Sequence, residues 1–207
     1  IFGHGYTANA FVDYIRNIDL EIFGTTRNPQ TADLLIKKGV KPLMWSDGSK
    51  IKSVINRSDY ILHSIPPTEI GDPVYKRFSK AIISRSTNLS WFGYLSTTSV
   101  YGNHDGKWVD ENIPVNPSSN RGLLRVKAEN NWSSIKDLPL HIFRLAGIYG
   151  PNRSPLDKIK SGKAQLISKP GQFFSRIHVE DIARVLKASI EMPNHGSVYN
   201  VCDDLPP

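Results

Sequence analysis

The sequence has a single cysteine, Cys202, among its 207 residues. One thiol cannot form an internal disulfide bond, which is typical of proteins in a reducing compartment. A metal site is not expected either, because one cysteine cannot build a thiolate site and the six histidines show no paired ligand spacing. We therefore predict a metal-free protein with a cytoplasmic localisation.

Long apolar runs are also missing. None approaches the ~18 residues that a membrane span needs. The opening residues IFGHGYTANA lack the basic head and long apolar stretch of a signal peptide. These absences predict a soluble protein without a membrane partner. Too few residues precede the first glycine for a strand, so we expect part of the first strand, and a C-terminal segment, to lie outside this sequence.

Positive charge is in excess but is not concentrated. The chain has 26 Lys and Arg against 19 Asp and Glu, a formal net charge of +7. Such a balance suits an anionic small molecule, for example a dinucleotide or a nucleotide sugar. The basic residues are scattered rather than gathered in one stripe, so we expect a small-molecule substrate and no nucleic-acid partner.

Short apolar runs alternate with segments of helical period, which is typical of βαβ units and a parallel sheet. The predicted strands cover 20–23, 42–45, 60–64, 91–96 and 141–145. The predicted helices cover 7–18, 29–38, 49–56, 73–84, 120–134 and 179–190. We predict one α/β domain over 1–207, a Rossmann fold with a doubly wound, mostly parallel sheet.

The second half of the chain is less regular. Residues 102–119 form a long loop-like stretch rich in Gly, Asn, Asp, Pro and Ser, and such loops often carry function. After Gly150 the helical and strand periods weaken. We therefore predict a nucleotide-binding core over 1–149 and a partial, small substrate-side lobe over 150–207.

Residues 3–8 read GHGYTA and fit the pattern G-x-G-x-x-G/A between a strand end and a helix. In this pattern the first glycine permits a tight turn, the second lets backbone N–H groups approach a pyrophosphate, and the small third residue packs helix against strand. A plain turn is the alternative, but the position at the start of a βαβ unit favours a dinucleotide. The predicted cofactor contacts are Gly3, Gly5, Tyr6, Thr7 and Ala8.

The acidic residue that would bind the adenine ribose of NAD, about 20 residues further on, is missing. Thr25, Thr26 and Arg27 stand there instead. A fixed guanidinium suits the additional 2′-phosphate of NADP. We predict these three residues as cofactor contacts and NADP as the cofactor, with NAD as the alternative. The simpler interpretation is that Arg27 is a surface residue at a helix start.

The predicted strand over 60–64 ends at His63 and Ser64, before two prolines. In an open parallel sheet the ligand lies across the carboxyl ends of the strands. We therefore predict His63 and Ser64 as further cofactor contacts. The alternative is that the prolines simply end the strand.

Three later segments, together with the glycine loop, resemble the NAD(P)-dependent epimerase/dehydratases, which are extended short-chain dehydrogenase/reductases. Residues 95–102 read LSTTSVYG, residues 143–151 read FRLAGIYGP and residues 177–183 read IHVEDIA. Their order after G-x-G-x-x-A is what makes the resemblance specific. It implies an NADP-binding oxidoreductase or epimerase acting on a carbonyl or sugar-nucleotide substrate, and a homodimer through the helices over 73–84 and 120–134.

By this resemblance, Thr97 takes the place of the catalytic Ser or Thr that hydrogen-bonds the reacting oxygen. The alternative is a strand-end threonine satisfied by backbone. The family's Y-x-x-x-K pair is absent from the whole chain, and Arg121 and Arg125 occupy its two positions. An arginine stays protonated near neutral pH and cannot replace the tyrosine as an acid or base. Arg125 could still hold the nicotinamide ribose or an anionic substrate group.

A displaced proton carrier would rescue catalysis, and the candidates are Tyr101 and His178. Each has a simpler interpretation, Tyr101 as loop packing and His178 as the anchor of its turn. Tyr149 and His178 are predicted to line the substrate side. The catalytic assignment is thus Thr97, Tyr101 and Arg125.

Two functions remain open at this point. The first is an atypical oxidoreductase or epimerase without the usual tyrosine. The second is a non-catalytic NADP-binding sensor or regulatory protein, which the loss of both members of the Y-x-x-x-K pair favours. Unrelated Rossmann dehydrogenases share only the glycine loop, and the segments VYG and IHV argue against them.

Overall fold

Strands and helices alternate along the chain in the computed structural model, which describes residues 1–154, 159–160, 162 and 173–205. The strands are β1 (Phe23–Thr26), β2 (Lys41–Met44), β3 (Tyr60–His63), β4 (Trp91–Thr97), β5 (Leu140–Leu145), β6 (Gly147–Tyr149), β7 (Arg176–His178) and β8 (Ser197–Val201). The α-helices are α1 (Tyr6–Ile15), α2 (Pro29–Lys37), α3 (Gly48–Ile55), α4 (Pro73–Arg85), α5 (Asn120–Ser133) and α7 (Val179–Glu191). Short 3₁₀ helices, η1 (Ser86–Asn88) and η2 (Thr98–Val100), flank β4.

The strands pair in parallel throughout the described part of the chain. One sheet has the order β3-β4-β5-β8, and β1 pairs with β2 beside it. Ile1 and Phe2 join the two: the Phe2 N–H donates to Leu62 O at 2.8 Å and the Thr25 N–H to Ile1 O at 3.0 Å. This confirms the predicted Rossmann-type α/β fold with a parallel sheet.

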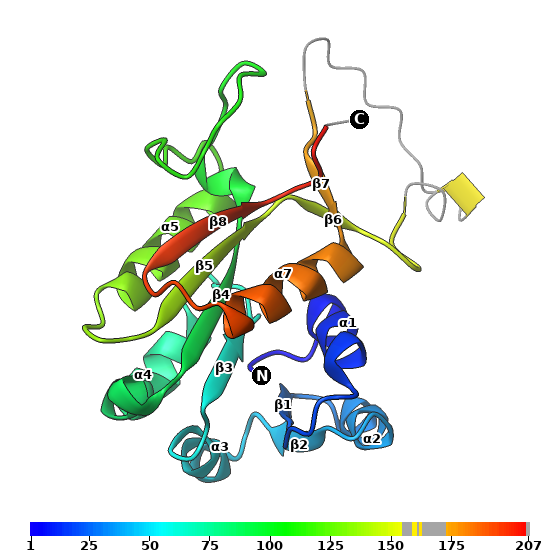
Figure 1. The fold of residues 1–207 in the computed structure, drawn as a ribbon, viewed down its shortest axis with the longest axis vertical. Coiled ribbons are helices and arrows are strands. Elements are labelled where there is room, and N and C mark those ends of the chain that lie inside the picture. Colours follow the sequence, from blue (N-terminus) through cyan, green and yellow to red (C-terminus); the bar gives the residue numbers. More distant parts are fainter. Residues whose placement is uncertain (155–158, 161, 163–172, 206–207) are drawn as a thin grey trace.

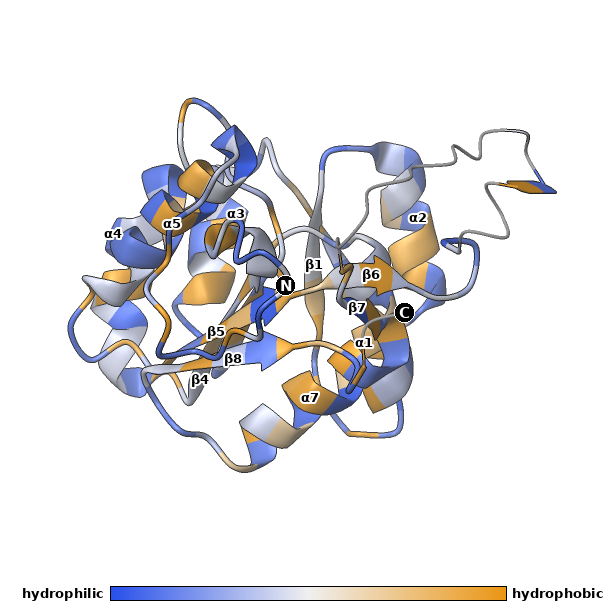
Figure 2. Ribbon diagram, turned by 90° about the horizontal axis from the view of Figure 1, so that it is seen from above, coloured by the Kyte–Doolittle hydropathy of each residue, from blue (hydrophilic) through white to orange (hydrophobic). Residues whose placement is uncertain are grey.

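Helices cover both faces of the sheet (Figures 1 and 2). Helices α3, α4 and α5 bury one core cluster, which includes Phe78, Phe92 and Trp132. Helices α1 and α7 pack on the opposite face around Phe143 and Leu186. Since crossover helices lie on both faces, parallel strands are buried on both sides, and β5 is buried at every position.

Helix starts follow from local sequence. Asn28, Asp47, Asp72 and Ser119 cap α2, α3, α4 and α5, each accepting from a backbone N–H of the first turn. Proline stands in the first turn of α2 and α4, where its missing N–H costs nothing. The start of α1 differs, because its N-cap is Gly5 and no side chain caps it.

The predicted strand over 20–23 is wrong. The strand starts at Phe23 and continues to Thr26, and residues 20–22 precede it. Its centre is Gly24 and Thr25, both buried, so an apolar run does not mark it. The short strands β6, β7 and β8 were also not predicted, and they pair with neighbours distant in sequence.

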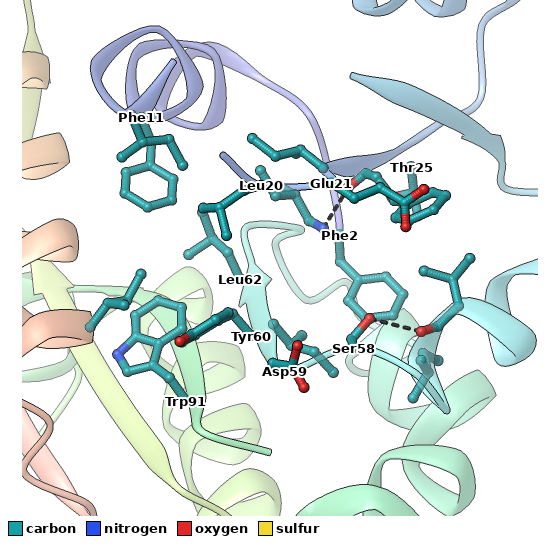
Figure 3. A pocket seen from close by; sticks show the side chains of 18 of the residues that line it. Phe2, Phe11, Leu20, Glu21, Thr25, Ser58, Asp59, Tyr60, Leu62 and Trp91 are labelled. Carbon is teal, nitrogen blue, oxygen red and sulfur yellow. Dashed lines mark hydrogen bonds between the residues drawn. The ribbon is translucent and has the colours of Figure 1, made fainter. Parts of the chain in front are cut away.

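An apolar pocket of about 420 Å³ lies between α1, β1 and β3 (Figure 3). Phe2, Phe11, Leu62 and Trp91 are among its lining residues. It opens at the starting ends of β1, β3 and β4, whereas ligands of open α/β sheets bind at the carboxyl ends. We therefore assign it to the packing of the core rather than to the functional site.

Candidate functional site

A cleft of about 1090 Å³ opens where β4 and β5 end. Its lining comes from segments far apart in the sequence, including Thr7 of α1, Ser64 after β3 and Thr97 at the end of β4. The loop over 102–109 and the start of α5 form further walls, and Phe173 and Phe174 contribute from the other side. The cleft thus gathers several of the residues predicted from separate motifs.

The glycine loop lies beside this cleft. Gly3 has φ of +81°, and a Cβ placed there would lie 2.6 Å from Ile65 Cγ1, so only glycine fits. The Gly3 N–H donates to Thr25 Oγ1 at 2.8 Å, and the His4 N–H donates to Thr25 O at 3.3 Å. These bonds tie the loop to the end of β1.

Gly5 provides the open side of the loop. A Cβ there would meet no atom of a described residue within 4 Å, and as a glycine this N-cap has no side chain to cap the helix that follows. The N-cap residue therefore supplies no side-chain acceptor to the first turn of α1, which carries the positive end of the helix dipole. Ala8 is fully buried against the sheet, and Thr7 lines the cleft. The loop fits the pyrophosphate of a dinucleotide.

Tyr6, next to the glycine loop, is hydrogen-bonded to the turn that follows β6. Its hydroxyl donates to Pro151 O at 3.0 Å, and the Arg153 guanidinium lies 5.4 Å from the centre of its ring. A Cβ on Gly150 would lie 2.7 Å from the Tyr6 hydroxyl oxygen. The turn after β6 is therefore held close to the start of α1, and it brings Arg153 into the cleft wall.

His4 is buried inside the loop. Among the described residues, neither of its ring nitrogens meets a hydrogen-bond partner. Burial and nearby positive charge lower the pKa of His4 to about 4. Since the unfolded chain then binds the proton more tightly, this histidine's contribution to stability is complete above pH 6.5 and is lost as pH falls toward 4.

We expect urea unfolding to show this loss. Between pH 7.5 and pH 5, His4 should lower the free energy of unfolding by about 2 kcal/mol, and His4→Leu should remove that part of the pH dependence. A His4→Leu protein with the wild-type pH dependence would contradict the assignment.

The residues predicted to bind the adenosine end have different roles. Thr25 is buried and its hydroxyl accepts from Gly3, so its side chain supports the loop instead of facing a ribose. Thr26 Oγ1 bonds the backbone of Asn28. Arg27 is exposed just after β1, and in the described part of the chain it forms no ion pair. Arg27 is therefore the member of this group that is free to reach a phosphate.

The side chain of His63 does not reach the cleft, which corrects that prediction. It is fully buried, with Nε2 2.8 Å from Asp72 Oδ2 in the core. Strand alternation explains the correction, since neighbouring side chains of β3 point to opposite faces. Ser64, by contrast, lines the cleft, and its N–H donates to Phe2 O at 2.9 Å.

Thr97 lies at the end of β4 and lines the cleft. Its Oγ1 accepts from the Ser99 N–H at 3.3 Å and caps η2. Because the hydroxyl is the acceptor in this bond, it retains its own proton for a donor bond. The geometry is compatible with both the catalytic and the simpler interpretation.

Tyr101 is buried, and its hydroxyl is engaged on both sides. It donates to Asn200 Oδ1 at 2.8 Å and accepts from Arg144 Nη1 at 2.8 Å. Arg144 in turn pairs with the buried Glu129 at 2.8 Å, and Ser96 also donates to that carboxylate. This network anchors the start of the long loop to β5 and β8, which favours the packing role of Tyr101 over proton transfer.

Arg125 lies against the back of β4. Its Nη1 donates to Tyr94 Oη at 3.2 Å and to Leu95 O at 2.5 Å. Only 7% of Arg125 is exposed, although it contributes to the cleft lining. Two of the five N–H donors of its guanidinium thus serve the end of β4.

Tyr149 and His178 contact each other, with ring centres 5.1 Å apart, but neither belongs to the lining of the cleft. His178 Nδ1 accepts from the Glu180 N–H at 3.4 Å and caps α7. A hydrogen bond with Asp203 raises the pKa of Tyr149. The predicted substrate-side pair is therefore assembled, but it lies outside the cleft wall.

Several cleft residues were not predicted from the sequence, among them Lys107, Trp108, Arg153, Phe173 and Phe174. They come from loops whose convergence is a property of the tertiary fold. Within the described residues, no group of three or more His, Cys, Asp or Glu could hold a metal ion. No helix there is long and apolar enough to cross a membrane.

The fold defines a Rossmann-type α/β protein with a glycine loop at the carboxyl end of its sheet. A functionally unknown conserved protein from Silicibacter pomeroyi DSS is 48% identical, with a TM-score of 0.92, over 99% of this chain and 72% of that one. The chain belongs to the family of this protein. No protein-family model matches the chain.

Other similarities are partial in length or limited to the fold. Protein YeeZ of Escherichia coli K12 is 32% identical over 109 residues, which are 53% of this chain and 38% of YeeZ. The dTDP-glucose 4,6-dehydratase of Bacillus anthracis, solved with NAD, is 17% identical over the whole chain and 75% of that enzyme, with a TM-score of 0.81. The UDP-glucuronic acid 4-epimerase of Bacillus cereus, also with NAD, is 17% identical over the whole chain and 78% of that enzyme, with a TM-score of 0.76. The resemblance to epimerase/dehydratases is thus confirmed at the level of the fold.

Proposed function

We propose that this protein binds a nicotinamide dinucleotide at the glycine loop and transfers hydride to or from a carbonyl or sugar-like substrate in the cleft. The observation that carries the proposal is the placement of the loop: the first turn of α1, whose N-cap Gly5 has no side chain to cap it, lines the same cleft through Thr7 as the Thr97 side chain does. Fold neighbours that are solved with NAD add support.

The bound nicotinamide ring would supply or accept the hydride. In this mechanism the chain positions the groups around it. The N–H groups of α1 hold the pyrophosphate, Thr97 donates a hydrogen bond to the substrate oxygen, and Arg125 holds the end of β4 in place through Leu95 O. Phe173 and Phe174, in the predicted substrate-side lobe, add apolar surface to the cleft lining.

NADP is the cofactor that we propose. The free guanidinium of Arg27 follows β1, the strand whose Thr25 is hydrogen-bonded to the glycine loop. Thr25, Thr26 and Arg27 stand where an acidic residue would bind the ribose hydroxyl of NAD. A guanidinium gains a charge-assisted, bidentate bond from the 2′-phosphate.

Replacing Arg27 tests this preference. Arg27→Gln should raise the NADP dissociation constant about 10- to 100-fold, corresponding to ~1.4–2.8 kcal/mol, and leave NAD binding nearly unchanged. Lys37→Gln, at the other end of α2, is the control and should change neither constant. Equal affinities of the wild type for NADP and NAD would contradict the proposal.

The second candidate function is a non-catalytic NADP-binding sensor. It is favoured by the arginines in place of the Y-x-x-x-K pair and by the engagement of the Tyr101 hydroxyl inside the protein. Turnover distinguishes the two. Oxidation of NADPH by any member of a panel of carbonyl and sugar-nucleotide substrates supports the enzyme, whereas tight binding without oxidation supports the sensor.

A homodimer through α4 and α5 is the assembly that we propose. Both helices carry exposed apolar side chains, Ile83 on α4 and Leu123 on α5. Sedimentation of the intact protein should show a dimer, and charged substitutions at both positions should dissociate it.

A further inference from the structure

The cleft wall carries an excess of positive charge. Among the described residues, its charged lining consists of Lys107, Arg121, Arg125, Arg153 and Asp105. Four cations thus face one carboxylate, and Asp105 already accepts a hydrogen bond from Asn103 Nδ2 at 2.9 Å. Like charges in one cleft repel one another unless an anion joins them.

Two of these cations already have partners. Arg125 donates to Tyr94 and Leu95, and Arg153 stacks on Tyr6 beside the glycine loop. Lys107 and Arg121 are exposed in the cleft, and neither forms an ion pair with a described residue. They are the lining cations for which the described part of the chain supplies no ion-pair partner.

The position of Arg121 is unfavourable for the helix that carries it. It stands in the first turn of α5, after the cap Ser119, and that turn has no acidic residue. A cation at the positive end of a helix dipole is disfavoured, by about 0.3–1 kcal/mol. Helix stability therefore does not explain the arginine at this position. An anion bound by Arg121 would explain it.

Close packing fixes this helix start beside Thr97. A Cβ on Gly122 would lie 2.6 Å from Ser99 O and 2.7 Å from Pro117 Cβ, so the glycine lets α5 approach η2. Ser99 in turn donates its N–H to Thr97 Oγ1 at 3.3 Å. The packing of α5 against η2 thus connects Arg121 with Thr97, the residue whose hydroxyl we propose to contact the substrate oxygen.

We propose that the substrate carries an anionic group, a carboxylate or a phosphate, which Arg121 binds together with Lys107 next to Thr97. This inference rests on the proposed function and specifies the substrate class of the same cleft. In the proposed function the phosphates of the cofactor are not the partner of Arg121, because the pyrophosphate lies at the start of α1 and the 2′-phosphate at Arg27. An oxidised nicotinamide ring is itself cationic and leaves the charge excess in place.

Small dianions provide the test. Malonate and inorganic phosphate are titrated by calorimetry into the intact protein saturated with NADPH. We expect at least one to bind the wild type, and Arg121→Gln to raise its dissociation constant at least about tenfold, with an unchanged NADPH dissociation constant and melting temperature. The preferred anion distinguishes a carboxylate from a phosphate substrate.

Lys127→Gln provides the matched control, because Lys127 is an exposed cation of the same helix that does not line the cleft. It should change anion binding less than twofold, and Arg121→Lys should retain part of the affinity. Failure of both anions to bind the wild type, or equal binding by Arg121→Gln, overturns the inference.

The anion titration can succeed or fail independently of NADPH binding, which tests the proposed function. If NADPH does not bind, the proposed function fails, and the anion titration is then made on the protein alone. A dependence on Arg121 in that titration still supports an anionic ligand for the cleft, and its absence still refutes one.

Discussion

Gly5→Asp should weaken NADP(H) binding at least about 100-fold without weakening the fold. The new carboxylate would project into the open space beside Gly5, where no atom of the described residues lies within 4 Å of a Cβ, and would repel a pyrophosphate. Aspartate is also a better N-cap than glycine, so α1 should gain a few tenths of a kcal/mol. Calorimetric titration with NADPH and urea unfolding measure the two effects.

The opposite signs of these two effects make the prediction specific. Asn56→Asp adds the same charge at the C-cap of α3 and should leave NADPH binding unchanged. If Gly5→Asp bound NADPH as the wild type does, the glycine loop would not be the phosphate site. If it unfolded more easily, the geometry assigned to the start of α1 would be wrong.

Asp72→Ala should lower the free energy of unfolding by about 3–5 kcal/mol. Asp72 is buried and accepts from His63 Nε2 and Trp132 Nε1, both at 2.8 Å, and from the N–H groups of Val74 and Tyr75. Burial alone would raise the pKa of this carboxyl, but the bonds from His63 and Trp132 outweigh burial and lower it. Removing the carboxylate leaves several buried donors unsatisfied at once.

Asp47→Ala is the natural comparison, because Asp47 caps α3 from an exposed position. It should cost only about 1 kcal/mol, the usual value for a lost cap. Urea unfolding at pH 7 measures both variants. Equal losses would show that Asp72 acts only as a helix cap and that its contacts with His63 and Trp132 contribute little.

Much of the fold could be predicted because its signals are local. Asn28, Asp47, Asp72 and Ser119 each stand at the predicted start of a helix and each caps one in the structure. The strands that were missed lack such signals. Strand β1 contains Gly24 and two threonines, and β8 gains its place through pairing with β5 rather than through an apolar run.

The site could be predicted only in part, because sequence position does not fix side-chain direction. Thr7, Ser64 and Thr97 line the cleft, but His63 points into the core and Thr25 supports the glycine loop. Those two outcomes depend on which neighbours β3 and β1 acquire when the sheet forms. Lys107 and Arg153 enter the cleft from loops, which no periodicity could locate.

The most direct test of the central claim is a calorimetric titration of NADPH into the intact wild-type protein, with NADH titrated in parallel. We predict one site with a dissociation constant below about 100 μM for NADPH and at least tenfold weaker binding of NADH. Absence of measurable binding of either dinucleotide would contradict the account.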